Sequence, residues 1–319
     1  MSDRAAPARQ APTRPAPQAA PGRPPRALPA PLGPWLASPW RKPRFLEAFT
    51  VLYLAWSLLP VGVAALFSFN AGRSRSSWQG FSLRWYWQDR SLSVWHDPEL
   101  HTALVHSLRL AALTTLVAVP IGVAFAIGVD RWHGRLARGA SFQMLLSFVV
   151  PELVLGVALL FLVANLFRFV HLGSVAQVLG LVTFQLSYPA VIVRARLLSI
   201  GPEYEEAAMD LGASPARATG RVLLPLLWPA IFASAVLVFA DVIDDFVIVR
   251  YLSSDAATEP MSVKIYAGAR SAPTPALNAL ATVMLVSSLL AVAAGVLVYR
   301  RLTRGERGTS AVADFASQL

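Results

Sequence analysis

The strongest constraint on this chain is a series of long apolar runs separated by shorter polar segments. A helix needs roughly 20 apolar residues to cross the hydrocarbon core of a bilayer. Only 14% of the residues are charged, whereas soluble proteins carry about 25%. The pattern predicts an all-α polytopic membrane protein with six transmembrane helices. The six runs cover residues 45–69, 103–129, 140–166, 173–193, 222–249 and 279–299.

Prolines fall inside three of these runs, at Pro120, Pro151 and Pro189. A proline removes one backbone hydrogen bond from a helix, and in a membrane protein the neighbouring helices can satisfy the freed carbonyl group. We therefore expect these prolines to kink their helices rather than to end them. The fourth run is the most interrupted, because Gln177 and Gln185 also fall within it.

The two ends of the chain differ in composition from the apolar region. Residues 1–44 hold half of the chain's 24 prolines and many arginines, but a single acid, Asp3. Such a segment cannot bury enough apolar surface to offset the entropy lost on ordering, so we expect a disordered, solvated tail. Attraction of its arginines to anionic lipid headgroups is the alternative. The predicted organisation is this tail, a membrane domain at 45–303 and a C-terminal tail at 304–319.

The basic residues predict how the chain is oriented in the membrane. The net charge of +10 would suit a nucleic-acid-binding protein, but most of the 28 Lys and Arg residues flank apolar runs, which argues against nucleic acid as a partner. They concentrate in the N-terminal tail, after the second run, after the fourth run and at the C-terminus. Because basic segments stay in the cytoplasm, both termini are expected there. Trp85, Tyr86 and Trp87 then lie outside, as interfacial anchors or, alternatively, as a ligand cage.

The segment between the fourth and fifth runs covers residues 194–224. One alternative is a surface loop that only connects two helices, but such a connector would be only a few residues long. Pro202 suits the first position of a helix, and the three glutamates after it suit the helix dipole. Gly212 can end this helix in a left-handed conformation, and Ser214 can cap a second one. A DNA-reading helix-turn-helix is the second alternative, but it would be held at a membrane surface.

Within this segment, E-A-A is followed after three residues by Gly, and after nine more by V-x-L-P. This pattern resembles the EAA signature of the permease subunits of binding-protein-dependent ABC importers, with Val222 in place of the usual isoleucine. The resemblance implies the type I ABC importer permease fold, and a coupling helix that sits in a groove of a separate ATP-hydrolysing subunit. The matching residues are Glu206, Ala207, Ala208, Gly212, Val222, Leu224 and Pro225.

The chain itself carries no recognisable catalytic machinery. A phosphate-binding loop needs glycines and a lysine in the order G-x-x-x-x-G-K-[ST], and neither Lys42 nor Lys264 follows such a run. No catalytic triad or metal-ligand cluster stands out either. We therefore expect a transport subunit rather than an enzyme, without metal or cofactor of its own. The resemblance implies that ATP and Mg are bound by the partner ATPase.

Three acids in the fifth run, Asp241, Asp244 and Asp245, are spaced to share one face of a helix. An ionisable group at membrane depth costs roughly 2.5–3.5 kcal/mol on insertion scales, so it should face a cavity or a partner. With Glu152 of the third run and Tyr188 of the fourth, these acids could line the path of a cationic solute. Alternatively they snorkel outward or pair with an arginine, for which the candidates are Arg109, Arg168 and Arg250.

Further stretches narrow the resemblance to one branch of these permeases. GFSLRWYWQD, PELVLGVALLFL, IDDFVIVRYL and SVKIYAGARSAPTPALNALATVMLV resemble the second membrane subunit of spermidine/putrescine importers, over about residues 45–303. The resemblance implies a bacterial inner-membrane heterodimer with a homologous permease, two copies of an ATPase and a periplasmic polyamine-binding protein. Sister branches carry iron, sulfate, phosphate or amino acids, so another solute remains open. An ion-gradient secondary transporter and a structural membrane scaffold are the alternatives outside this family.

Overall fold

The computed structural model describes residues 44–74, 77–132, 134–167, 169–271 and 274–303. The expected tails at 1–43 and 304–319 lie outside these residues. The chain divides into two compact units, residues 1–57 and 58–319, and the division falls within helix α2. The described part of the first unit is the beginning of α2, whose side chains are exposed. All helices after α2 belong to the second unit.

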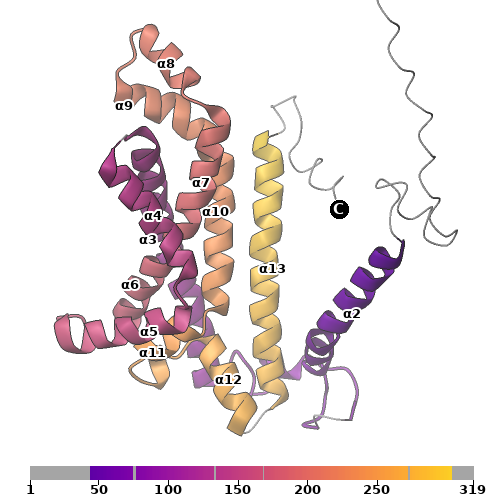
Figure 1. Cartoon of the computed structure of the whole chain (residues 1–319). Coiled ribbons are helices and arrows are strands. Elements are labelled where there is room, and N and C mark those ends of the chain that lie inside the picture. Colours follow the sequence, from indigo (N-terminus) through magenta and orange to yellow (C-terminus); the bar gives the residue numbers. More distant parts are fainter. Residues whose placement is uncertain (1–43, 75–76, 133, 168, 272–273, 304–319) are drawn as a thin grey trace, which may run out of the picture. The chain divides into compact units, whose positions relative to one another are not determined.

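The described residues are almost entirely helical, as expected (Figure 1). Five helical segments are long and apolar enough to cross a bilayer, and one pair of helices bent by 106° is a sixth candidate. The five are α2, α3, α6 with α7, α9 with α10, and α13, and the bent pair is α4 with α5. The bounds are α2 (Arg44–Phe67), α3 (Pro98–Arg131), α4 (Arg135–Val149), α5 (Glu152–Phe161), α6 (Ser174–Gln185), α7 (Ser187–Ile200), α8 (Glu203–Asp210), α9 (Pro215–Ala218), α10 (Leu224–Asp244), α11 (Val247–Leu252), α12 (Met261–Ser271) and α13 (Pro275–Thr303).

Helices α3, α7 and α10 pack against one another, and α13 packs along α10. A Cβ atom at Gly122 of α3 would lie 2.5 Å from Cγ of Pro189 in α7, and one at Gly295 of α13 would lie 2.7 Å from Cγ2 of Val236 in α10. Small residues therefore allow these backbones to approach closely, as is common where helices pack within membranes. Pro120 lies inside α3 without ending it, as expected.

Pro151 ends a helix instead of kinking it, which corrects the expectation for the third run. Val150 has φ −66° and ψ 122°, because a residue that precedes proline is driven out of the helical region. Helix α4 stops before it, and α5 starts after Pro151 in a new direction. Glu152 consequently begins a helix rather than lying in the middle of one.

The fourth run forms one candidate span from Ser174 to Ile200, so Pro189 does not end it, as expected. The interruption falls at Leu186, between α6 and α7, and Pro189 lies in the first turn of α7, where a missing N–H group costs little. The helix then continues to Ile200, past the expected end at residue 193. Gln177 is fully buried, and its side-chain amide donates to the backbone carbonyl of Thr258 at 2.8 Å. Its carbonyl oxygen lies 2.8 Å from Nε2 of buried His106, so α6 is pinned to α3.

The fifth run ends earlier than expected, since α10 stops at Asp244. Asp245 has ψ 127°, and its carbonyl oxygen accepts a hydrogen bond of 2.6 Å from the Ser262 hydroxyl. Its carboxylate accepts from the N–H of Val249 at 3.3 Å, which satisfies one free N–H group in the first turn of α11. Asp244 is exposed whereas Asp245 is buried. The prediction that the three aspartates share one helix face was therefore wrong.

The loop before α3 contains a π-helical turn, η1 (Arg84–Gln88). Trp85 in this turn is fully buried, and its indole N–H donates to the carbonyl of Asn70 at 2.6 Å. It is a packing residue, so the expectation of an interfacial anchor was wrong for Trp85. Trp87 is exposed and remains a candidate for that role.

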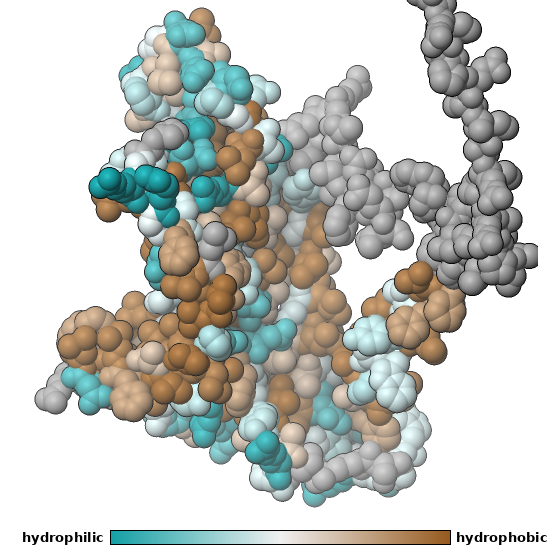
Figure 2. Space-filling model, viewed as in Figure 1, coloured by the Kyte–Doolittle hydropathy of each residue, from teal (hydrophilic) through white to brown (hydrophobic). Residues whose placement is uncertain are grey.

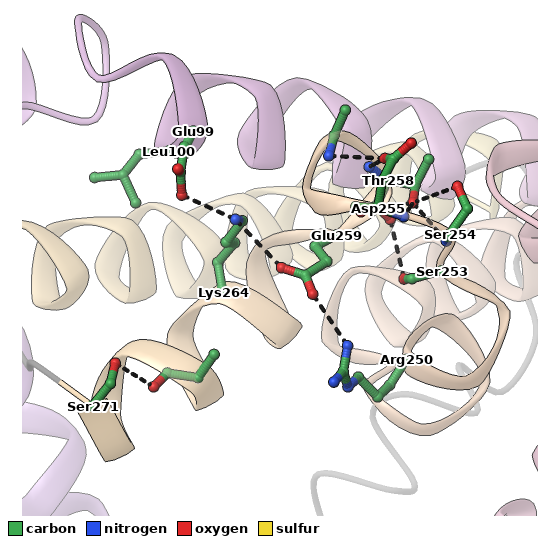
Figure 3. A network of polar contacts seen from close by, with 12 residues as sticks. Glu99, Leu100, Arg250, Ser253, Ser254, Asp255, Thr258, Glu259, Lys264 and Ser271 are labelled. Carbon is green, nitrogen blue, oxygen red and sulfur yellow. Dashed lines mark hydrogen bonds and ion pairs between the residues drawn. The ribbon is translucent and has the colours of Figure 1, made fainter.

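A network of ion pairs lies at the end of the helices opposite α8 and α9 (Figure 1, Figure 3). Lys264 of α12 lies between Glu99 of α3, at 3.1 Å, and Glu259, at 3.3 Å (Figure 3). Glu259 also binds Arg250 of α11 at 3.1 Å. Burial acts to lower the pKa of Lys264, but its hydrogen bonds to Glu99 and Glu259 outweigh this and raise it. The network therefore links α3, α11 and α12.

Candidate functional site

The elbow, which we define as residues 201–225, joins α7 to α10 through two short helices. Pro202 is the residue before α8 rather than its first residue, a shift of one position from the expectation. Gly212 has φ +89°, the left-handed conformation expected for it. Its N–H donates to the carbonyl of Met209 at 2.9 Å, and the N–H of Ala213 donates to Ala208 at 3.0 Å. This double closure is a Schellman motif, which gives the chain a sharp reversal after α8.

The second half of the elbow runs from Ser214 into α10. Ser214 precedes α9 in an extended conformation, and Pro215 is the first helical residue, as expected. The Ser214 hydroxyl, however, makes no capping hydrogen bond within the described part of the chain. A π-helical turn, η3 (Thr219–Leu223), then leads into α10. Helix α7 extends to Ile200, so the elbow is shorter than the expected segment at 194–224.

An ion pair that sequence reasoning missed ties the elbow to the end of α3. Glu205 is buried, and its carboxylate pairs with the guanidinium group of Arg131, the last residue of α3. The Thr219 hydroxyl donates to the other carboxylate oxygen at 3.3 Å. Arg131 also pairs with Asp130 at 2.7 Å. The two halves of the elbow and α3 therefore meet at Glu205, which no local sequence pattern distinguishes from Glu206.

The residues of the EAA signature divide into two groups. Glu206, Ala207 and Gly212 are exposed on the surface of the elbow, and Ala208 is half-buried. Val222 and Leu224 are half-buried at the start of α10, and Pro225 is exposed there. Leu211 beside Gly212 is 91% exposed, an unusual state for a large apolar residue at a polar end of the molecule. Figure 2 shows this end as mainly hydrophilic with apolar side chains among them.

The acidic cluster, which we define as Glu152, Asp241, Asp244 and Asp245, is brought together from several elements. Asp245 lies within electrostatic reach of both Glu152 and Asp241. Asp241 accepts a hydrogen bond of 2.6 Å from the Gln185 amide. Asp244 interacts electrostatically with Asp241. Helices α5, α6 and α10 and the turn after α10 therefore contribute to one site.

Cations of the chain do not neutralise this cluster where the structure describes them. Arg250 pairs with Glu259 instead, and Arg168 lies outside the described residues. Arg109 forms no ion pair with an acid of the cluster among the residues described. Four carboxyl groups linked by electrostatic interactions make the site acceptor-rich, so it favours a ligand that brings positive charge and N–H donors.

Tyr188 borders the acidic cluster and belongs to an aromatic group. It lies within electrostatic reach of Asp241 and Glu152. Its ring meets Phe148 of α4 at 5.3 Å and Phe184 of α6 at 6.3 Å between centroids, edge to face in both cases. The faces of such rings attract cations. The sequence suggested Tyr188 as a candidate but gave no sign of Phe148 and Phe184, because they are apolar residues in apolar runs.

Comparisons with known proteins show the family of this chain. The family model "Binding-protein-dependent transport system inner membrane component" matches residues 118–308. The putrescine transport system permease protein PotI of Escherichia coli (strain K12) is 32% identical over 257 residues, which are 79% of this chain and 88% of that protein. The spermidine/putrescine transport system permease protein PotC of the same strain is 33% identical over 259 residues, 81% of this chain and 95% of that protein.

A solved structure shows the same fold. It is a bacterial ABC transporter involved in the import of the acidic polysaccharide alginate, with a TM-score of 0.65, 16% identity, and coverage of 85% of this chain and all of that one. The protein is thus a permease subunit of the type I ABC importer class, a transport protein and not an enzyme. The chain belongs to the binding-protein-dependent transport system inner membrane component family, and is an integral inner membrane protein.

Proposed function

We propose that this chain is one half of the pore of an ATP-driven importer that takes up polyamines such as putrescine and spermidine. The observation that carries the proposal is the acidic cluster, assembled from separate helices beside Tyr188 without a neutralising cation among the described residues. The similarity to PotI and PotC over about four fifths of the chain supports the same solute class. A periplasmic binding protein would deliver the solute to the outer side.

A polyamine suits this cluster chemically because it is a flexible chain with an ammonium group at each end. Each ammonium group can donate to carboxylates such as Asp241 and Asp245, and these charge-assisted hydrogen bonds are stronger than those between neutral groups. Tyr188 can hold the ammonium or the adjacent methylene groups against its ring. Asp241 accepts a hydrogen bond from the Gln185 amide, and the solute would displace that amide.

The elbow is proposed as the coupling element. Its exposed residues, with Glu206 and Leu211 among them, would dock into one of two copies of a separate ATPase, which binds the ATP and Mg. A homologous permease would form the other half of the pore. This arrangement requires the elbow and both termini to lie in the cytoplasm. Closure of the ATPase dimer would then move the elbow, and the pair between Glu205 and Arg131 would pass that movement to α3.

Uptake by the complete complex tests this proposal. Proteoliposomes with the binding protein and ATP should accumulate radiolabelled putrescine or spermidine. Replacing Asp241 by Asn should reduce uptake kcat/KM about 10- to 150-fold, the range expected for one charged hydrogen bond of about 1.5–3 kcal/mol. Glu47→Gln is the matched control, because Glu47 is an exposed acid at the start of α2, away from the cluster in sequence.

Two results would contradict the proposal. Uptake of another cation with no uptake of either polyamine would exclude the proposed solute class. Uptake that persists without ATP and collapses with an uncoupler would instead indicate an ion-gradient transporter.

A further inference from the structure

A cavity of about 340 Å³ lies at the turn between α3 and α4, apart from the acidic cluster. Its lining includes Asp130 and Trp132 at the end of α3, Arg138 and Ser141 of α4, and Arg194 of α7. In Figure 2 hydrophilic residues gather over this turn, directly beside the end that carries α8 and α9. Neither the solute path nor the docking surface of the elbow uses these residues.

The charge of the cavity is positive. Arg138 and Arg194 both line it, and within the described ranges neither forms an ion pair with an acid. The acid in the lining, Asp130, pairs with Arg131 at 2.7 Å, and Arg131 also pairs with Glu205. These three arginines and two acids leave one net positive charge at the cavity, and neither Arg138 nor Arg194 pairs with either acid. Guanidinium groups in this position favour the oxygens of a phosphate group.

Arg194 also has an unused donor. Its Nη1 donates to the Ser141 hydroxyl at 3.1 Å, which holds the guanidinium group at the wall between α4 and α7. Its Nε is buried and has no hydrogen-bond partner in the described structure. A buried N–H without a partner is costly, and a ligand that accepts from it recovers that cost. A bound phosphate oxygen is such an acceptor.

The surroundings of the cavity are those of a membrane interface. Trp132 lies in the lining and is 61% exposed. Leu136 and Phe142, on the same helix as Arg138, are 70% and 67% exposed. Tryptophan and exposed apolar side chains beside basic residues are typical of the zone where lipid headgroups meet acyl chains. This combination favours a phospholipid over a soluble anion.

We propose that this cavity binds the headgroup phosphate of an anionic phospholipid, with Arg138 and Arg194 as the phosphate ligands and Trp132 at the rim. The proposal rests on the orientation proposed above, which places the α3–α4 turn at the cytoplasmic leaflet. Basic pockets between membrane helices on that side are suited to anionic headgroups. The bound lipid would lie beside Arg131, which pairs with Glu205 of the elbow. It would therefore stabilise the ion pair that connects the elbow to α3.

Lipid binding to the complete importer complex tests the proposal. The complex is purified in detergent, and phosphatidylglycerol, zwitterionic phosphatidylethanolamine or inorganic phosphate alone is titrated in, with bound lipid measured by native mass spectrometry. Phosphatidylglycerol should be retained over phosphatidylethanolamine. Arg138→Gln should weaken its binding about fivefold, and Arg138→Gln with Arg194→Gln about 25-fold, from roughly 1 kcal/mol per arginine near a membrane surface. The control Arg301→Gln, at the end of α13, removes a basic charge outside the cavity.

The outcomes separate this proposal from the proposed transport function. The Arg138 side chain forms no hydrogen bond in the described part of the chain, and the backbone bond of its N–H to Gly134 does not depend on that side chain, so Arg138→Gln leaves the fold intact even if the change at Arg194 does not. Equal phosphatidylglycerol binding by wild type, Arg138→Gln and Arg301→Gln would overturn the site. Inorganic phosphate that displaces the lipid at equal concentration would overturn the lipid assignment. Polyamine uptake by the same preparations in zwitterionic vesicles reports on the transport function independently.

Discussion

Replacing Glu205 by Ala should release the elbow from α3 without unfolding the permease. The carboxylate accepts from Arg131 and from Thr219 at 3.3 Å, and Ala removes both contacts while retaining the helix propensity of α8. A hydrogen bond to a charged group contributes about 1.5–3 kcal/mol. The Arg131 side chain is 33% exposed and retains its ion pair with Asp130, so water and Asp130 compensate part of the lost interaction free energy.

The remaining cost of about 1–2 kcal/mol corresponds to a roughly 5- to 30-fold larger open population of the elbow. Amide hydrogen exchange in α8 and η3 should therefore accelerate by that factor, measured on the permease pair with the ATPase removed. Exchange in the core of α10 should not change. In the complete complex, the number of solute molecules imported per ATP should fall, because the ATPase would move an elbow that no longer pulls on α3.

Glu206→Ala is the matched control, since it makes the same change on the same helix at an exposed residue. It should leave exchange in α8 unchanged without the ATPase, and weaken docking when the ATPase is present. If Glu205→Ala changes exchange in α8 by less than twofold, or if the two variants behave alike, the anchoring role of Glu205 is wrong.

Three further predictions follow from local geometry. Gly212→Val should raise the free energy of the left-handed turn by more than the roughly 1–2 kcal/mol that a residue with a Cβ atom costs there. The altered turn should uncouple the two activities, so ATP hydrolysis should persist while uptake falls. Normal uptake per ATP would contradict this. Trp85→Phe leaves a buried carbonyl group without its donor and should destabilise the fold by about 1–3 kcal/mol, read as a lower Tm; an unchanged Tm would exclude a structural role. A hydrogen bond from the backbone N–H of Ser91, and then one from Arg84, lower the pKa of Asp89. The loop around Asp89 should therefore stay ordered above the unfolded carboxyl pKa of about 3.9 and lose its order as the pH falls below that value. Amide hydrogen exchange in this loop should show an extra acceleration below about pH 4 that is absent in Asp89→Asn.

The sequence by itself determined the features that depend on neighbouring residues. The apolar runs are long enough for membrane helices, and the structure has helices for all of them. Gly212 adopts the left-handed conformation predicted from its position after a short helix. The position of the elbow followed from a signature confined to some twenty residues. These features depend on residues a few positions apart, and for that reason the sequence predicts them.

The end of each helix was less predictable, because it depends on partners elsewhere. Pro120 and Pro151 look alike in the sequence, yet α3 continues through one and α4 stops before the other. Asp245 leaves the helix because Ser262 and Val249 supply hydrogen bonds to it from beyond the turn. A proline or an aspartate within an apolar run does not reveal whether such partners exist.

Only the tertiary structure decided which polar groups act together. Glu205 and Arg131 are 74 positions apart, and Gln185 and Asp241 are 56 apart. Adjacent Glu205 and Glu206 differ in role because one side of α8 faces α3 and the other faces away. Trp85 is buried because the fold brings the Asn70 carbonyl group to its indole. Burial and charge pairing are properties of the packed chain, so local composition can identify such candidates but cannot assign them their partners.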